Sequence, residues 1–309
     1  MKVGFFPNMT HTQVLMGKEN KFQNALGDDC NIQWKQFNAG SSEIEALLAG
    51  EIDMGYIGPG PAINGYIKSN GGLQIIAGAC EGGAILISRS DVNIKDVKEL
   101  SGKKVAIPQF GNTQHVVLKE LLELNGLKET TKGGTVEIVQ ADTPDIKTLF
   151  DKKAIDAALV PEPWGARLIE ESKANMVLDY NKVWREGKYP VTVVIARTDF
   201  IKQHPEVVEK FLKTHVELTE QANRNTEEAK KTINGQIKAL TGKELTPNIV
   251  NSSFNRLLIT NNPDKDAVKD MADIMKSLGI TKGNQNIDGI FNLSILNKIL
   301  QEKGEQPIK

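Results

Sequence analysis

The stretch NAGSSEIEALLAGEIDMGYIGPGPAI, residues 38–63, contains two turns marked by glycine, and each turn precedes a predicted helix. Such turns bind phosphate in many proteins, because free backbone N–H groups and the positive end of the helix dipole meet there. Neither turn completes a nucleotide motif: Gly58-Pro59-Gly60 lacks the third glycine of a dinucleotide fingerprint, and the chain has no Gly-x4-Gly-Lys-Ser/Thr run. We therefore expect these helix ends to hold something other than a nucleotide.

A second copy of the pattern is QADTPDIKTLFDKKAIDAALVPEPW, residues 140–164. Each copy contains the end of a strand, a polar turn, a short amphipathic helix, an Ile-Asp strand and a proline-rich turn. Ser42 and Glu45 form a predicted capping box in the first copy, and Thr143 is the predicted cap ahead of an N1 proline in the second. Two interpretations stay open: coincidence between two ordinary β-α-β units, or one α/β design used twice.

The composition excludes several classes of partner. The 309 residues include 38 basic and 39 acidic side chains, a net charge of −1, which does not favour nucleic acid or an acidic membrane surface. The N-terminal MKVGFF reads as a first strand and not as a signal peptide, so the protein is either cytosolic or has lost a targeting segment. Cys30 and Cys80 flank different strands, and we expect two free thiols and no disulfide.

Strands alternate with helices as far as about residue 197, and the rest of the chain is predicted to be nearly all helix. Such alternation is typical of α/β folds with parallel strands and helices on the faces of each sheet. The predicted strands are 2–6, 32–37, 53–57, 74–78, 84–88, 104–107, 136–140, 156–160, 176–178 and 191–197. The predicted helices are 12–26, 42–49, 61–69, 95–100, 113–125, 144–152, 163–171, 205–224, 226–240, 247–256, 264–278 and 291–302.

Polar turns at the carboxyl ends of the strands are the candidate binding site, because ligands of α/β sheets bind there beside helix N-termini. In the first turn Thr10 or Thr12 is a predicted helix cap, and in the fourth Asn112 or Thr113 is. The turns offer hydroxyls, amides and backbone N–H groups but few charges, which suits a small anion or zwitterion. They are FPNMTHTQ (6–13), NAGSSE (38–43), IGPGPAI (57–63), IPQFGNTQH (107–115) and VPEPW (160–164).

Catalytic and metal-binding signals are weak. His11 and His115 lie in two of these turns, and we interpret them as hydrogen-bonding residues and not as a metal pair, so no metal or cofactor is predicted. The motifs H-E-x-x-H, C-x-x-C and G-x-S-x-G are absent from the sequence. His204 and His215 fall in a long polar helix, where we expect them to be solvated. Two aspartates at repeated strand positions, Asp53 and Asp156, are interpreted as structural.

At this point the motifs GFFPNMTH, GSSEIEALLAGEIDMGYIGPGPAIN, AIPQFGNTQH and VPEPW together resemble the substrate-binding proteins of bacterial ABC importers for aliphatic sulfonates, taurine and nitrate. The resemblance covers most of residues 2–200. It implies the type 2 periplasmic-binding-protein fold, with mixed sheets flanked by helices and two crossing hinge strands. The lobes would be 1–88 with 196–309, and 89–195, with the ligand in the cleft between them. It also implies an exported monomer that works with a permease and contacts the membrane only through a removed lipid anchor.

The resemblance also implies where the ligand binds. The residues that carry it over are Thr10, His11, Gly40, Ser41, Ser42, Gly58, Pro59, Gly60, Gln109, Asn112, Thr113, Gln114, Glu162 and Trp164. The carboxylate of Glu162 would repel a bare anion, so it either binds an ammonium or hydroxyl group or points away from the cleft. Trp164 either stacks on the ligand or fills the core.

The function that the resemblance implies is non-catalytic capture of a small organic anion or zwitterion, with aliphatic sulfonates such as taurine as the leading class. The alternative is a synthase or binding protein for the pyrimidine precursor of thiamine, because proteins of that kind share the fold.

Overall fold

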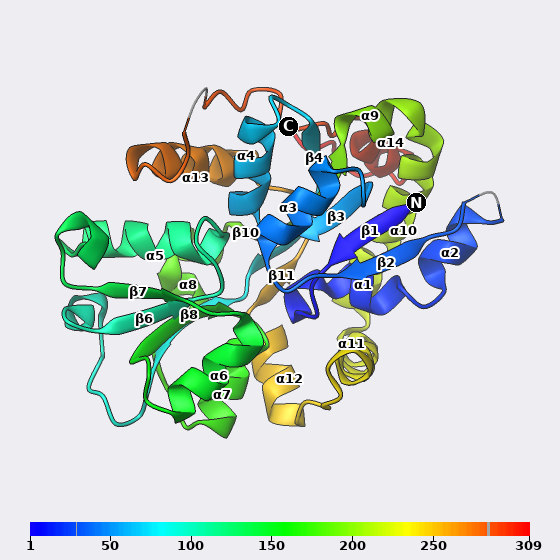
Figure 1. Ribbon diagram of the computed structural model, residues 1–309. Helices are drawn as coiled ribbons and strands as arrows, with labels where there is room; N and C mark the ends of the chain where they lie inside the picture. Colours follow the sequence, from blue (N-terminus) through cyan, green and yellow to red (C-terminus); the bar gives the residue numbers. More distant parts are fainter. Residues whose placement is uncertain (29, 283–284) are drawn as a thin grey trace.

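The computed structural model describes residues 1–28, 30–282 and 285–309, and its strands form two mixed sheets (Figure 1). In the first sheet β1 runs parallel to β2 and β3, whereas β10 lies antiparallel between β3 and β4. The order across it is β11 (Leu257–Ile259), β4 (Leu73–Gly82), β10 (Pro190–Arg197), β3 (Met54–Ile57), β1 (Lys2–Phe5) and β2 (Gln33–Gln36).

The second sheet repeats the parallel arrangement on a smaller scale. Strand β6 runs parallel to β7 and β8, and β5 lies antiparallel between β8 and β9. The order is β7 (Glu137–Gln140), β6 (Lys104–Ile107), β8 (Ala157–Pro161), β5 (Ala84–Ser88) and β9 (Asn175–Leu178). Every residue of β3, β5 and β8 is buried, which explains their almost continuous apolar sequences.

Helices cover both sheets, and α5 to α8 contact the strands of the second. Those four are α5 (Thr113–Leu124), α6 (Thr143–Asp151), α7 (Trp164–Glu171) and α8 (Tyr180–Val183). The others are α1 (Thr12–Gly17), α2 (Lys21–Leu26), α3 (Gly40–Leu48), α4 (Pro59–Lys68), α9 (Thr198–Gln203), α10 (Pro205–Arg224), α11 (Thr226–Thr241), α12 (Pro247–Phe254), α13 (Lys265–Ser277) and α14 (Ser294–Glu302). Short 3-10 turns are Met9–His11, Val97–Leu100, Thr130–Lys132 and Arg185–Gly187. No described helix is both long and apolar enough to span a bilayer.

The chain passes from the first sheet to the second at Gly83, between β4 and β5, and returns between β9 and β10. These changes of sheet fall before the expected lobe boundaries near residues 88 and 196. The division into two lobes stays a prediction. One large apolar cluster runs through both sheets, and a smaller cluster lies between the second sheet and α6 and α7.

Several sequence-based expectations need correction. The predicted helix 12–26 is two helices, because the chain leaves helical geometry between Gly17 and Lys21. The C-terminal part is not wholly helical, since β11 joins the edge of the first sheet. The capping box is wrong: α3 begins at Gly40, and the hydroxyl of Ser42 donates to the Ala39 carbonyl. Neither Thr10 nor Thr12 caps α1, and the side chain of Thr143 does not cap α6.

His215 was expected to be solvated and is fully buried, although His204 is exposed as predicted. Its Nδ1 lies 2.7 Å from the hydroxyl of Tyr56, and its Nε2 lies 2.9 Å from the carbonyl oxygen of Gly78. The polar helix α10 is enclosed by α1, α2, α11 and α14, so one of its histidines joins the core. Both cysteines are free thiols, as predicted.

Candidate functional site

A cavity of about 40 Å³ lies where four helices of the two sheets begin. The helices α3 and α4 follow strands of the first sheet, and α5 and α6 follow strands of the second. The cavity is lined by Phe6, Asn8, Thr10, His11, Asn38, Ala39, Gly40, Gly58, Pro61, Pro108, Asn112, Thr113, Gln114, Thr143, Pro161 and Val191. Because a helix dipole is positive at its N-terminus, four such ends favour negative charge in the space they enclose.

The lining residues carry no formal charge. They provide hydroxyl and amide donors, together with one imidazole, that of His11. Burial lowers the pKa of His11 to about 3, so its ring is neutral at physiological pH. The backbone N–H of Phe6 donates to Nδ1 at 3.3 Å, which assigns the ring proton to Nε2 and makes that nitrogen a donor. The site therefore combines positive dipole ends with neutral donors.

The start of α5 is organised by Asn112. Its side-chain oxygen accepts the N–H of His115 at 2.8 Å, which confirms the predicted cap. Its amide nitrogen donates to the side-chain oxygen of Gln114 at 3.1 Å. This bond directs the oxygen of Gln114 toward Asn112 and leaves its NH₂ group free to donate elsewhere. Thr113 lies between them and also lines the cavity.

The elements on either side of the cavity contact each other directly. The N–H of Gly60 donates to Oγ1 of Thr113 at 3.2 Å. Two hydrogen bonds join Ser41 and Gln109: the Ser41 N–H donates to Oε1 of Gln109 at 2.9 Å, and Nε2 of Gln109 donates to the Ser41 hydroxyl. The N–H of Met9 donates to the carbonyl of Glu162 at 3.2 Å. These bonds close the cavity around its neutral lining.

The carboxyl group of Glu162 points away from the cavity. It is fully buried and accepts hydrogen bonds from Arg256 at 2.9 Å, from the Ala166 N–H at 2.9 Å and from the Ser253 hydroxyl at 3.1 Å. Burial raises the pKa of Glu162, and the guanidinium of Arg256 opposes that rise. Its negative charge is thus directed into a network behind the site, which leaves the cavity free for an anion.

Trp164 packs in the core of the second sheet and is 6% exposed. Its indole N–H donates to the side-chain oxygen of Asn8 at 2.9 Å. Asn8 lines the cavity and Trp164 does not, so the indole orients a lining residue from behind.

Half of the binding residues suggested by the sequence line the cavity: Thr10, His11, Gly40, Gly58, Asn112, Thr113 and Gln114. The other half do not line it: Ser41, Ser42, Pro59, Gly60, Gln109, Glu162 and Trp164. The turns expected to form the site also contain the lining residues Phe6, Asn8, Asn38, Ala39, Pro61, Pro108 and Pro161, whereas Thr143 and Val191 lie outside those turns. Thr143 occupies the position of the second repeat that matches Ser41 in the first, so the repeat was a usable signal for it. Val191 had no local signal.

The two histidines considered for metal binding have different surroundings, and only His11 lines the cavity. His115 does not line the cavity, its Nδ1 accepts the Gly111 N–H at 3.0 Å, and burial lowers its pKa to about 4. Nδ1 of His11 is likewise occupied. Within residues 1–28, 30–282 and 285–309, no group of three or more His, Cys, Asp or Glu side chains could hold a metal ion.

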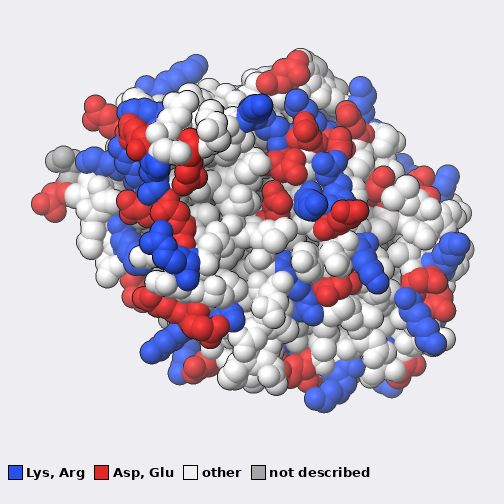
Figure 2. All heavy atoms as spheres, turned by 180° about the vertical axis from the view of Figure 1, so that it is seen from behind, with Lys and Arg blue, Asp and Glu red and all other residues white. Residues whose placement is uncertain are grey.

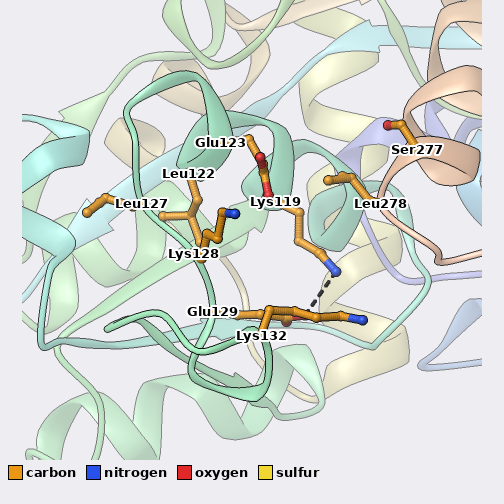
Figure 3. A pocket seen from close by; sticks show the side chains of 9 residues that line it. All are labelled: Lys119, Leu122, Glu123, Leu127, Lys128, Glu129, Lys132, Ser277 and Leu278. Atoms are coloured by element: carbon orange, nitrogen blue, oxygen red, sulfur yellow. Dashed lines mark hydrogen bonds and ion pairs between the residues drawn. The ribbon is translucent and has the colours of Figure 1, made fainter.

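A larger cavity, of about 280 Å³, lies along the C-terminal half of α5 (Figure 3). Lys119 reaches across it to Glu129 at 2.9 Å, and other charged side chains of both signs line the walls. Its remaining walls come from the last turns of α5 and α13, where helix dipoles are negative. This cavity is therefore less suited to an anion than the smaller one, despite its size.

Comparison with known proteins supports the family suggested by the sequence. The profile of the NMT1-like family matches residues 1–235. The taurine-binding periplasmic protein of Escherichia coli (strain K12) is 28% identical over 200 residues, which cover 64% of this chain and 59% of that protein. A putative aliphatic sulfonates-binding protein of Bacillus subtilis (strain 168) is 24% identical over 206 residues, 65% of this chain and 59% of that protein. The chain thus spans about 59% of the length of these relatives.

Solved structures share the fold at low sequence identity. The alkanesulfonate-binding protein from Xanthomonas axonopodis pv. citri bound to MOPS has a TM-score of 0.75 and 18% identity, over 92% of this chain and 94% of that one. The periplasmic nitrate-binding protein from Synechocystis PCC 6803 has a TM-score of 0.82 and 15% identity, over 97% and 88%. The predicted fold class, mixed sheets flanked by helices as in periplasmic binding proteins, is confirmed.

Proposed function

The chain belongs to the NMT1-like family, and on that premise we propose that it is the solute-binding component of an ABC importer. Its ligand is a small organic anion or zwitterion, with aliphatic sulfonates, taurine among them, as the leading class. This class is named in the relatives from Escherichia coli and Bacillus subtilis. In this role the protein captures and releases its ligand without catalysing a reaction.

The observation that carries the proposal is the neutral cavity at four helix N-termini. A sulfonate is ionised at all physiological pH values, so it needs donors and no proton acceptor. Hydroxyls, amides and the Nε2–H of His11 supply donors, and the helix dipoles supply a favourable potential without a mobile counter-charge. We assign the anion to Thr10, His11, Gly40, Gly58 and the start of α5, and we infer that Ser41, Gly60 and Gln109 hold these elements together.

Capture by closure of two lobes follows from the same proposal. Residues 1–88 with 196–309 would form one lobe and residues 89–195 the other, with hinges near the changes of sheet. Bonds such as Gly60 to Thr113 and Ser41 to Gln109 would then form only in the closed state. A ligand that touches both sides would favour that state through its binding energy.

The proposed setting is outside the cytoplasmic membrane, with a permease as partner and the protein as a monomer. Basic and acidic side chains intermix over the face seen in Figure 2, which fits a soluble receptor better than a nucleic-acid-binding surface.

A thermal-shift screen followed by titration calorimetry tests the proposal. The screen contains taurine, methanesulfonate, ethanesulfonate, nitrate, sulfate and a hydroxymethylpyrimidine. A sulfonate at about 100 times its dissociation constant should add about 2.7 kcal/mol to the free energy of unfolding. Preference for the pyrimidine would favour the thiamine-related alternative, and stabilisation by no sulfonate would overturn the proposal.

Two hydroxyl deletions locate the site. Thr113→Val removes a hydroxyl that lines the cavity, and we expect it to weaken sulfonate binding by about 1.5–3 kcal/mol. Ser42→Ala removes a hydroxyl on the neighbouring helix α3 that does not line the cavity, and affinity should not change. Equal effects of the two changes would place the anion elsewhere.

A further inference from the structure

We propose that the cavity distinguishes anions by whether the bound head group carries a proton, and that Trp164 is a positioning residue for this discrimination. A head group whose oxygens only accept hydrogen bonds fits the lining. A head group of the same charge that retains a hydroxyl proton is rejected, because the lining directs its acceptor atoms away from the ligand. The inference rests on the proposed function and deepens it by assigning the selectivity of that site to particular hydrogen bonds.

The amide of Asn8 is oriented by Trp164. The indole N–H donates to the side-chain oxygen of Asn8 at 2.9 Å. An indole nitrogen can only donate, so the atom that meets it must be the amide oxygen and not the amide nitrogen. Trp164 packs in the core of the second sheet and does not line the cavity, whereas Asn8 does. The oxygen of Asn8 is therefore directed toward the core, which leaves its NH₂ group to donate to a ligand.

The start of α5 repeats this logic with a backbone donor. The N–H of His115 can only donate, so the atom of Asn112 that lies 2.8 Å from it must be the amide oxygen. The amide nitrogen of Asn112 then faces Gln114 at 3.1 Å, and the atom that accepts from it must be Oε1. One backbone N–H thus orients both amides, and the NH₂ group of Gln114 remains free to donate.

Other acceptors of the lining are engaged by N–H groups of the chain as well. Nδ1 of His11 accepts the N–H of Phe6 at 3.3 Å, so the ring proton lies on Nε2. Oγ1 of Thr113 accepts the N–H of Gly60 at 3.2 Å, which leaves its hydroxyl hydrogen to donate. Four backbone carbonyls of the lining accept an N–H from the turn or helix that follows them: those of Asn8, Ala39, Gly58 and Asn112.

The side chains of Thr10, Thr143 and Asn38 complete the polar lining. A threonine hydroxyl can accept a ligand proton only by directing its own hydrogen elsewhere, and Asn38 is half-buried, so water can meet its amide. The carboxyl group of Glu162, which could accept a proton, is bonded to Arg256 behind the site. A proton on the bound head group therefore lacks a good acceptor, and an unpaired buried donor lowers affinity by about five- to a hundredfold.

Calorimetry with methanesulfonate and methylphosphonate at about pH 5 tests the discrimination. Both ligands carry one negative charge at about pH 5, but only the phosphonate retains a proton on oxygen, because groups of the phosphate type lose their second proton near pH 6 or above. The helix dipoles attract both ligands alike, so the comparison isolates the proton. We expect the wild-type protein to prefer methanesulfonate by at least about tenfold.

A variant of Trp164 separates positioning from packing. Trp164→Phe keeps an aromatic ring and removes the N–H, so the amide of Asn8 can turn its oxygen toward the ligand. The preference for methanesulfonate should fall by at least about threefold. A merely structural defect would weaken both ligands alike and leave their ratio unchanged. Trp34→Phe is the matched control, because the indole N–H of Trp34 is buried without a partner among the described residues, and the ratio should not change.

A second measurement needs no variant. The affinity of the wild-type protein for methylphosphonate should rise by at least about threefold between about pH 5.5 and 8.5, as the ligand loses its proton. Methylphosphonate affinity that stays constant or falls over this range would overturn the discrimination.

Two failures are distinguishable. If methanesulfonate binds and methylphosphonate binds equally well at about pH 5, or if Trp164→Phe weakens both ligands by the same factor, the discrimination is wrong and the proposed function stands. If no sulfonate binds, the proposed function fails and the discrimination fails with it.

Discussion

Glu43, in α3, places its carboxyl group against the first sheet. This group is fully buried and has no hydrogen-bond partner among the described residues. The space for it comes from two glycines of the adjacent strands. A Cβ at Gly4 or Gly55 would lie 2.4 or 2.1 Å from its Oε1. Burial raises the pKa of Glu43 well above its usual value, because the interior favours the neutral, protonated form of the carboxyl group.

The first prediction is that Glu43→Gln stabilises the protein increasingly as pH rises. The folded pKa lies above the unfolded pKa, so the folded state binds more protons, and wild-type stability falls with rising pH between those two values. The fall is about 1.4 kcal/mol per pH unit, and an amide of the same shape avoids it. Urea unfolding at about pH 4.5 and about pH 7.5 measures the difference. The exposed Glu45→Gln on the same helix is the control, and a gain independent of pH would contradict the assignment.

The second prediction concerns His11, whose pKa of about 3 keeps the ring neutral. Among the described residues that line the cavity, His11 has the only titratable side chain. Sulfonate affinity should therefore change by less than about twofold between pH 5.5 and 8, because neither ligand nor lining changes charge. Calorimetry across that range checks it. Affinity that rises as pH falls would show that the imidazolium form holds the anion.

Some individual roles could be read from the sequence and others could not. Asp53 and Asp156, interpreted as structural from the repeat, do the same work: each accepts the N–H of a strand residue, Lys2 at 2.8 Å and Lys104 at 2.9 Å. The role of Glu162 could not be deduced because its partner, Arg256, is 94 residues away in the chain. A local sequence pattern can indicate the structural role of a residue within a repeat. An ion pair between residues far apart in the chain can be identified only once the fold is known.

At the scale of helices and strands, apolar periodicity predicted almost every long element. The predicted 205–224 and 104–107 agree with α10 and β6 residue for residue. The failures are short: β11 has three residues, too few to show alternation, and it forms because the edge of β4 is available. The first residues of helices were harder to predict from the sequence, because α3, for example, begins at Gly40 with no side-chain cap. The list of individual cavity-lining residues predicted at those helix starts was therefore incomplete.

The third prediction concerns the contact between the first turns of α4 and α5. A Cβ on Gly60 would lie 2.9 Å from the backbone nitrogen of Thr113 and 3.0 Å from the carbonyl carbon of Asn112. Backbone atoms cannot rotate away, so Gly60→Ala must separate the two helix ends. We expect affinity for the ligand to fall about tenfold or more, in line with 1–3 kcal/mol for overpacking. Calorimetry measures it.

Gly235→Ala is the matched control for that change. Gly235 lies within α11, and a Cβ there would meet no atom within 4 Å. Alanine should stabilise the helix by about 0.5–1 kcal/mol and leave affinity unchanged. Wild-type affinity in Gly60→Ala would mean that the ligand-bound protein does not bring α4 and α5 this close.

At the scale of the whole molecule, the repeat seen in the sequence corresponds to equivalent parts of two sheets. In each sheet strands that precede helices pair in parallel, and an antiparallel strand, β10 or β5, lies beside them. The sequence predicted the α/β alternation, but the antiparallel strands could not be deduced, because their direction depends on the changes of sheet. The same connections bring α12 against α7 and α13 against α5, two of the helices that cover the second sheet.

Arg256 connects the two sheets through ion pairs. It directly precedes β11, which pairs with β4 in the first sheet. Its guanidinium bonds to Glu162 at 2.9 Å and to Asp179 at 2.7 Å, and both carboxylates follow strands of the second sheet. Gly82, at the end of β4, approaches it so closely that a Cβ would lie 2.7 Å from the carbonyl oxygen of Arg256.

The fourth prediction is a double-mutant cycle on this link. Arg256→Met leaves the buried carboxyl of Glu162 without its charge partner, and we expect a loss of about 3–5 kcal/mol in the free energy of unfolding. Glu162→Gln should cost less, because Arg256 is partly exposed and keeps Asp179. The double variant should then be more stable than Arg256→Met alone, because the amide needs no counter-charge. Urea unfolding measures the free energy of unfolding of all four proteins.

The control is Lys243→Ala, which removes a more exposed ion pair with Glu171 and should cost at most about 1 kcal/mol. Additive effects of Arg256→Met and Glu162→Gln would show that the ion pair does not join the two sheets energetically.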